Sequence, residues 1–229
     1  MRTAVVTGAG RGIGRSIARA LAAAGFTLAL IGRHEDTLRE TLPDALILPA
    51  DVTDAAALDG AFTTIGASWP RLDVLVNNAG TFGPTKPLED VGRDEFSHIL
   101  ATNLVSAFWC TQHAVRAMKE QQPTGGRIFN IGSISAQKPR PNSVAYAVSK
   151  HGMTGLTRST NLEGRAFGIS CTQLDIGNAQ SAMSGPMGEP TFDPAHIGTV
   201  VATLAGLPHD VSVLELTMLA TAMPFLGRS

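Results

Sequence analysis

The sequence has few of the residues that cross-link a small fold or bind a metal ion. Its 229 residues include two cysteines, Cys110 and Cys171, which are too few for a disulfide framework and lack metal-ligand spacing. The six histidines also show no ligand spacing, so we expect no metal site. These absences argue against disulfide-rich and zinc-binding modules.

Strong net charge and long apolar runs are missing too. The net charge is −1, which gives no electrostatic basis for binding nucleic acid or a membrane surface. No apolar run reaches the roughly 18–20 residues of a membrane span. An apolar strand pattern begins at Thr3 with no charged leader before it, so we expect no secretory signal and a cytoplasmic protein.

The chain does contain a sizeable apolar fraction, 44%, arranged in short strand-like runs that alternate with helical patterns. Strands that alternate with helices predict a parallel sheet with right-handed crossovers. The length favours a single domain over residues 1–229. The expected fold class is therefore α/β.

A glycine-rich turn joins the first predicted strand, 3–7, to a helical pattern that ends at Gly25. Glycines let the backbone turn tightly and approach a pyrophosphate, and the helix N-terminus attracts that anion. The order of strand, turn and helix therefore predicts dinucleotide binding by the turn glycines Gly8, Gly10, Gly12 and Gly14.

The residues after the second predicted strand, 27–31, favour NADP(H) as the cofactor, with NAD possible. An acidic residue there would bond the ribose of NAD, whereas an arginine suits the 2′-phosphate of NADP. Here Arg33 follows the strand, Arg11 lies in the glycine turn, and no carboxylate occurs before Glu35. The alternative is that Arg33 is a solvated residue at a helix start and that the site accepts either cofactor.

The next two strand patterns, 46–54 and 72–80, end in polar residues at the edge where parallel sheets bind ligands. Asp51 is expected either near the adenine or as a turn carboxylate, and Asp54 as the cap of the following helix. The fourth strand runs into 77–80, where asparagines can tie strand ends together and a glycine leaves room for a ligand.

Three residues carry the predicted chemistry. Tyr146, the only tyrosine, and Lys150 are four residues apart in a predicted helix, so their side chains share one face. A nearby cation lowers the pKa of a phenol, which suits general acid–base catalysis. Ser133 follows a buried strand pattern, and its hydroxyl can hold a carbonyl oxygen. The trio suits hydride transfer at a carbonyl carbon, although an ordinary helix can also carry a tyrosine and a lysine.

With TGAGRGIG at 7–14, NNAG at 77–80, Asn103, Ser133 and YAVSK at 146–150 in this order, the chain resembles the short-chain dehydrogenase/reductase family over about residues 3–177. The resemblance implies a doubly wound (Rossmann) parallel sheet of about seven strands with helices on both faces. It also implies metal-free, NAD(P)(H)-dependent chemistry on a small carbonyl or alcohol substrate, in a homodimer or homotetramer.

By position, the resemblance implies a catalytic set of Asn103, Ser133, Tyr146 and Lys150. Ser133 orients the substrate, Tyr146 transfers the proton, and Lys150 bonds the nicotinamide ribose and lowers the pKa of Tyr146. Asn103 holds a water on the proton relay, or else is a helix-interior residue that bonds its own backbone. Together with the residues argued above, the cofactor set is Gly8, Gly10, Arg11, Gly12, Ile13, Gly14, Arg33, Asp51, Val52, Asn77, Ala79, Gly80, Tyr146, Lys150, Ile176 and Asn178.

The chain departs from the family at two places. Ile176 stands where the family has a proline before Gly177, and Ser181 lies near the position of a threonine that bonds the nicotinamide carboxamide. The tail within 174–229 ends without the family's usual turn after the seventh strand, so the resemblance gives it no role.

The substrate lid is expected at about 177–193, a short segment rich in glycine and proline that predicts a small or partly exposed substrate. Within it, Met183 and Met187 are candidates for an adaptable apolar wall, or else are ordinary packing residues. Further candidates for substrate contact are Phe82, Gln137, Pro139 and Asn142.

These observations favour an NADP(H)-dependent carbonyl reductase or alcohol dehydrogenase. One alternative is a nucleotide-binding regulatory or scaffold protein without turnover; such proteins typically lack the tyrosine or the lysine. The other is an NAD-dependent sugar or polyol dehydrogenase, against which the absence of an acid after Ile31 argues.

Overall fold

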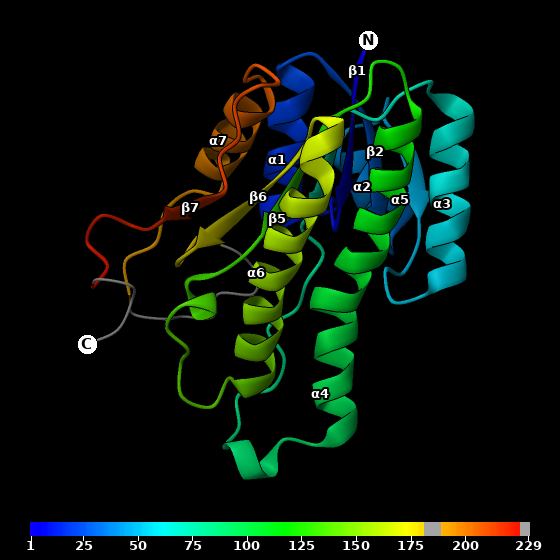
Figure 1. The fold of residues 1–229 in the computed structure, drawn as a ribbon. Coiled ribbons are helices and arrows are strands. Elements are labelled where there is room, and N and C mark those ends of the chain that lie inside the picture. Colours follow the sequence, from blue (N-terminus) through cyan, green and yellow to red (C-terminus); the bar gives the residue numbers. More distant parts are fainter. Residues whose placement is uncertain (181–188, 225–229) are drawn as a thin grey trace.

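The computed structural model describes residues 1–180 and 189–224, which form a parallel sheet between two layers of helices (Figure 1). The seven strands of this part of the chain are ordered β3-β2-β1-β4-β5-β6-β7. Every neighbouring pair is parallel, which confirms the predicted fold class. The strands are β1 (Arg2–Thr7), β2 (Phe26–Gly32), β3 (Leu46–Pro49), β4 (Val74–Asn77), β5 (Gly126–Ile131), β6 (Ile169–Ile176) and β7 (Glu215–Met218).

Helices cover both faces of the sheet. In Figure 1, α1 and α7 lie side by side at one face, and α3 and α5 lie at the other. The long α6 also packs on the sheet, with its polar residue Thr157 bonded to Asn130 of β5. The helices are α1 (Gly12–Ala23), α2 (Glu35–Thr41), α3 (Ala55–Ser68), α4 (Arg93–Leu100), α5 (Ser106–Glu120), α6 (Val144–Gly164) and α7 (Ala195–Ala205).

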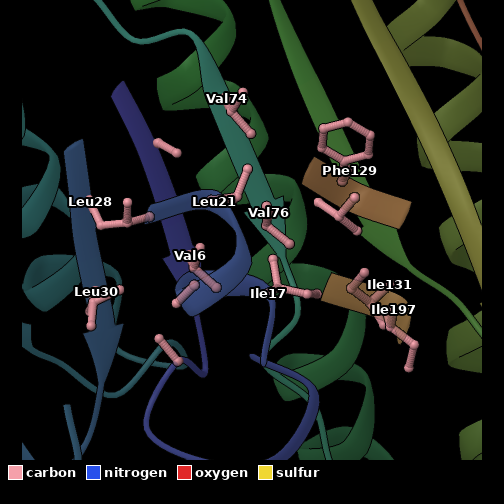
Figure 2. Packing of buried hydrophobic residues seen from close by; sticks show 14 of the residues in the cluster. Val6, Ile17, Leu21, Leu28, Leu30, Val74, Val76, Phe129, Ile131 and Ile197 are labelled. Atoms are coloured by element: carbon pink, nitrogen blue, oxygen red, sulfur yellow. The ribbon is translucent and has the colours of Figure 1, made fainter. Parts of the chain in front are cut away.

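The alternation of side chains along each strand builds two separate cores. Figure 2 shows Ile17 and Leu21 of α1 among Val6, Val74 and Val76 of the sheet. The intervening residues face the other way into a second cluster under α3 and α5, which includes Val5, Ala29, Ile31, Leu75 and Ile128. Because both faces are covered, the central strands are mostly apolar, as parallel strands generally are, and the polar residues buried in them, such as Asn130 of β5, are hydrogen-bonded.

Two local signals in the sequence act as predicted. Gly25 ends α1 in a left-handed conformation, with φ of +85°, and its N–H donates to the carbonyl of Ala22 at 2.9 Å. Asp54 caps α3, since its carboxylate accepts hydrogen bonds from the N–H groups of Ala56 and Ala57 at 2.9 and 3.1 Å. Gly25 therefore lies where the chain turns back into β2, and Asp54 lies where the chain leaves β3 for α3.

The helix predicted over 96–121 is interrupted. A turn of π-helix at Ala101–Val105 separates α4 from α5, with Asn103 at its centre. The Asn103 side chain accepts from the N–H of Thr81 and donates to the carbonyl of Thr81, both at 2.8 Å. The structure therefore overturns the reading that Asn103 bonds its own backbone. The wider turn lets the amide face the loop after β4.

The tail that the sequence left unassigned contains the edge strand of the sheet. Strand β7 pairs with β6, and the segment after it brings Leu219, Ala220 and Met223 against Ile134. The tail therefore packs beside the residues that follow β5. In residues 1–180 and 189–224, no helix is long and apolar enough to span a membrane. The same residues contain no group of three or more His, Cys, Asp or Glu side chains that could hold a metal ion.

Close packing of α7 on α1 gives a stability prediction. A Cβ at Gly198 of α7 would lie 2.5 Å from the carbonyl oxygen of Ser16, so Gly198→Ala forces the helices apart. We expect a loss of about 1–3 kcal/mol in the free energy of unfolding, measured by urea denaturation. The matched control is Gly60→Ala in α3, where a Cβ meets no neighbour within 4 Å. It should gain about 0.5–1 kcal/mol. Equal effects at both positions would contradict this packing.

Candidate active site

A cavity of about 460 Å³ opens at the carboxyl ends of the strands. The strand order turns around between β1 and β4, and open parallel sheets bind ligands in the crevice at such a point. Among the residues predicted to bind a cofactor, all but Asn77 line this cavity, and so do Ser133, Tyr146 and Lys150 of the catalytic set. The structure therefore brings residues from seven separate segments of the chain to one site.

The glycine turn lies where a side chain would collide with backbone. Gly8 has φ of +64°, and a Cβ on it would lie 2.9 Å from the Cα of Ala79. A Cβ on Gly14 would lie 2.3 Å from the carbonyl oxygen of Gly8. The turn is thus packed against the loop after β4, and α1 begins at Gly12 beside the cavity. This geometry fits an anion held by backbone N–H groups at a helix N-terminus.

Two residues that the sequence analysis did not assign hold this turn to β4. The Thr7 hydroxyl accepts from the N–H groups of Asn78 and Ala79 at 3.0 and 3.1 Å. In return, the Asn78 amide donates to the carbonyl groups of Thr7 and Gly8 at 2.9 and 3.2 Å. The signal available in the sequence was the paired asparagine after the fourth strand, since one asparagine side chain there can bond the neighbouring strand end.

Asn77 is the predicted cofactor residue that does not reach the cavity. Its side chain is buried and donates to Thr111 of α5 at 3.0 Å and to Asn130 of β5 at 2.8 Å. Successive residues of a strand point to opposite faces. Asn77 therefore faces the helix layer, whereas Asn78 lines the cavity.

One end of the cavity carries two arginine side chains and a histidine. Arg11, Arg33 and His34 line it, whereas Glu35, the first carboxylate after β2, is bonded to Arg39 one helical turn away at 2.6 Å. Asp51 also lines this end. Hydrogen bonds from Thr53 hold the pKa of the Asp51 carboxyl below its usual value, with a smaller effect of Arg33. This end of the cavity therefore combines two arginines with one carboxylate.

The other end contains the predicted catalytic trio. Ser133 follows β5, and its backbone is extended. Tyr146 and Lys150 project from the first two turns of α6, with the Lys150 Nζ 5.6 Å from the centroid of the Tyr146 ring. The Lys150 ammonium donates to the carbonyl oxygen of Ile131 at 2.7 Å. Phe82 packs against the tyrosine ring at a centroid distance of 4.7 Å.

Burial dominates the titration of this end. It raises the pKa of the Tyr146 phenol, and the hydrogen bond from Ser133 opposes that rise. The direction is opposite to the lowered pKa that the sequence predicts, because removal from water outweighs the nearby charges. Burial also lowers the pKa of Lys150 to about 8. Lys150 therefore remains mainly cationic at neutral pH.

Asn103 lies behind the cavity. It is fully buried, and besides Thr81 it bonds the Ser149 hydroxyl at 3.1 Å. Ser149 in turn donates to the carbonyl oxygen of Tyr146 at 2.7 Å. Asn103 therefore links the loop after β4 to the helix that carries Tyr146 and Lys150.

Ile176, the last residue of β6, and Asn178 line the cavity, as expected. Asn178 has φ of +53°, and its amide oxygen accepts from Arg140 at 2.9 Å. Arg140 also lines the cavity and pairs with Glu189 at 2.8 Å. Arg140 and Glu189 were missed because neither lies in a recognisable motif.

The substrate-side predictions divide into three groups. Phe82 lines the cavity beside Tyr146. Gln137, Pro139 and Asn142 are not among the residues that line it, and the Gln137 amide bonds Asp175 instead. Ser181, Met183 and Met187 lie outside the described residues. The described ends of the predicted lid meet where Gln180 donates to the carbonyl oxygen of Phe192 at 2.9 Å.

Comparison with known proteins points to one family. A family model for short chain dehydrogenases matches residues 2–191. A 3beta-hydroxysteroid dehydrogenase from Mediterraneibacter gnavus is 33% identical over 177 residues, which span 74% of this chain and 63% of that protein. The chain thus covers somewhat less than two thirds of this relative.

Solved structures agree over nearly the whole chain. The alcohol dehydrogenase from the archaeon Thermococcus sibiricus, complexed with 5-hydroxy-NADP, has a TM-score of 0.90 at 28% identity and covers 98% of both chains. A metagenomic short-chain oxidoreductase in complex with NADP has a TM-score of 0.86 at 30% identity. That match covers 96% of this chain and 97% of the other.

The junction between β1 and β4 gives a prediction. Thr7→Val keeps the side-chain shape but leaves the N–H groups of Asn78 and Ala79 without their acceptor in a buried place. We expect the free energy of unfolding to fall by about 1–3 kcal/mol, measured by urea denaturation. Thr27→Val, at an exposed position of β2, is the control and should change it little. A Thr7→Val protein as stable as the control would show that these bonds do not hold the junction.

Proposed function

The chain belongs to the short-chain dehydrogenase family, and from this premise we propose that it is an NADP(H)-dependent oxidoreductase that interconverts a small carbonyl compound and its alcohol. The observation that carries the proposal is the meeting of Ser133, Tyr146 and Lys150 in the same cavity as the glycine turn. A nucleotide bound along this cavity would place its reactive end near the trio and its phosphates near the glycines.

The residues of the cavity fit NADP(H). The glycine turn offers backbone N–H groups without side chains in the way, which suits the pyrophosphate. Arg11 and Arg33 suit the 2′-phosphate, and Glu35, the first carboxylate after β2, is engaged by Arg39. The bound NADP of the metagenomic relative supports the same choice.

The trio would handle the oxygen and the proton of the reaction. When bound, the nicotinamide supplies or accepts a hydride. Ser133 would donate a hydrogen bond to the carbonyl oxygen, where negative charge develops. Tyr146, whose raised pKa keeps the phenol protonated, would give that oxygen its proton during reduction.

Lys150 and Asn103 would support the proton transfer. Lys150 is cationic at neutral pH and, being on the face of α6 that carries Tyr146, would bond the ribose and stabilise negative charge on the phenol as the proton leaves. Asn103, which bonds Thr81 in the loop after β4, would hold a water molecule through which protons pass between Lys150 and solvent. We further propose that the protein is cytoplasmic and that it forms a homodimer or homotetramer. The exposed apolar side chains of Phe108 in α5 and Val148 in α6 support the association of subunits.

The first prediction from this proposal concerns proton transfer. The wild-type protein should oxidise NADPH in the presence of at least one member of a panel of small aldehydes, ketones, diketones and 3-oxoacyl esters. The decrease in NADPH absorbance measures this oxidation. Tyr146→Phe removes the proton donor but no predicted cofactor phosphate contact. It should lower kcat by about 10²–10⁴-fold with NADPH affinity nearly unchanged.

If Tyr146→Phe kept most of the turnover, the proton-transfer role would be wrong. If no carbonyl compound were reduced while NADPH still bound tightly, the alternative of a nucleotide-binding protein without turnover would replace the enzyme.

The second prediction concerns cofactor choice. Arg33→Ala removes a charged donor from the cationic end of the cavity, and a hydrogen bond to a charged group contributes about 1.5–3 kcal/mol. We expect NADPH to bind about 10–100-fold more weakly and NADH to be little affected, as measured by fluorescence titration. The control is Arg116→Ala, an exposed arginine of α5. Equal weakening of both cofactors by Arg33→Ala would refute recognition of the 2′-phosphate.

A further inference from the structure

A buried carboxylate stands directly behind the catalytic serine. Asp175, near the carboxyl end of β6, is 4% exposed and does not line the cavity. Its Oδ1 accepts from the backbone N–H of Ser133 at 2.9 Å and from Gln173 at 2.8 Å, and its Oδ2 accepts from Gln137 at 3.0 Å. All three partners donate, so the arrangement satisfies the ionised carboxylate.

The backbone makes room for this carboxylate. A Cβ on Gly132 would lie 2.0 Å from the Oδ1 of Asp175. Any side chain at position 132 would therefore displace Asp175 from the N–H of Ser133. The close approach of the Asp175 carboxylate therefore explains why a glycine stands at position 132. A larger residue there would require a different side chain at position 175.

Two opposite charges thus hold the same stretch of backbone. The Lys150 ammonium bonds the carbonyl oxygen of Ile131, and the Asp175 carboxylate bonds the N–H of Ser133 two residues later. The charged groups that act on Tyr146 are Arg140, from the segment before α6, and Asp175, from β6. Ser133 adds a hydrogen bond from the turn after β5, and Lys150 lies on the same helix as Tyr146.

We propose that Asp175 is a positioning residue for the proposed reaction: its carboxylate fixes Ser133 through the backbone N–H, across from the Lys150 ammonium that holds Ile131, and its charge acts on Tyr146. Its catalytic meaning rests on the proposed function, whereas its effect on Tyr146 is a property of the free protein.

The charge of Asp175 favours the protonated phenol. Asp175 raises the pKa of Tyr146, whereas Ser133 and Arg140 act in the opposite direction. Asp175 also opposes the effect of burial on Lys150, whose ammonium it stabilises. Burial raises the pKa of Asp175 itself, and its three donors and Lys150 counter that rise. The result is a site in which Tyr146 keeps its proton and Lys150 keeps its charge, as reduction of a carbonyl requires.

The direct test uses the fact that Tyr146 is the only tyrosine. The near-ultraviolet absorbance of its phenolate reports one titration in the free protein, without substrate or cofactor. Asp175→Asn keeps an oxygen for the N–H of Ser133 but removes the charge. Tyr146 should then titrate at a pH lower by about one unit. The basic limb of the pH profile of kcat/KM for NADPH-dependent reduction should move down by the same amount.

Asp73→Asn is the matched control, because Asp73 is a largely buried carboxylate bonded to Thr3 and Arg71 and does not line the cavity. It should leave the tyrosine titration unchanged. If Asp175→Asn does not fold by circular dichroism, Asp175→Ser, which is uncharged and smaller, takes its place. Unchanged titration of Tyr146 in the folded uncharged variant, or an equal shift in the Asp73→Asn control, would overturn the inference. Absence of turnover in the wild-type protein would instead refute the proposed function and leave the titration result valid.

Discussion

The cavity depends on the bonds that join the ends of β1 and β4. At this point the strand order turns around, and the two loops leave the sheet in opposite directions. The Thr7 hydroxyl and the Asn78 amide hold the loops together, and Gly8 lies against Ala79 with no space for a side chain. The glycine turn and the start of α1 are therefore placed by contacts with β4 rather than by their own sequence.

Most of the fold was predictable because its signals are local. Strands buried on both faces are mostly apolar, and the end of α1 and the start of α3 are set by single residues, Gly25 and Asp54. The trio was predictable for a similar reason. Tyr146 and Lys150 are one helical turn apart, and Ser133 follows a strand whose carboxyl end must meet the others at the same edge of the sheet.

What the sequence did not predict depends on contacts between distant segments. The choice between Asn77 and Asn78 depends on which residue at the end of β4 faces the cavity, and one residue of difference reverses the direction of the side chain. The π-helical turn around Asn103 follows from its bonds to Thr81, 22 residues earlier. The tail was unassigned because β7 is short and half exposed, and because its pairing with β6 joins residues about 40 positions apart, which leaves no local signal.

The direction of the Tyr146 pKa was unpredictable for the same physical reason. Sequence spacing places a cation near the phenol, but it does not show how much water the folded chain removes or which anion lies behind the serine. Asp175 lies outside the cavity wall, yet it holds the backbone of Ser133, which lines the cavity. The backbone of Ile131–Ser133 lies between the charges of Lys150 and Asp175, so the position of the catalytic serine and the charge state of the tyrosine have a common origin.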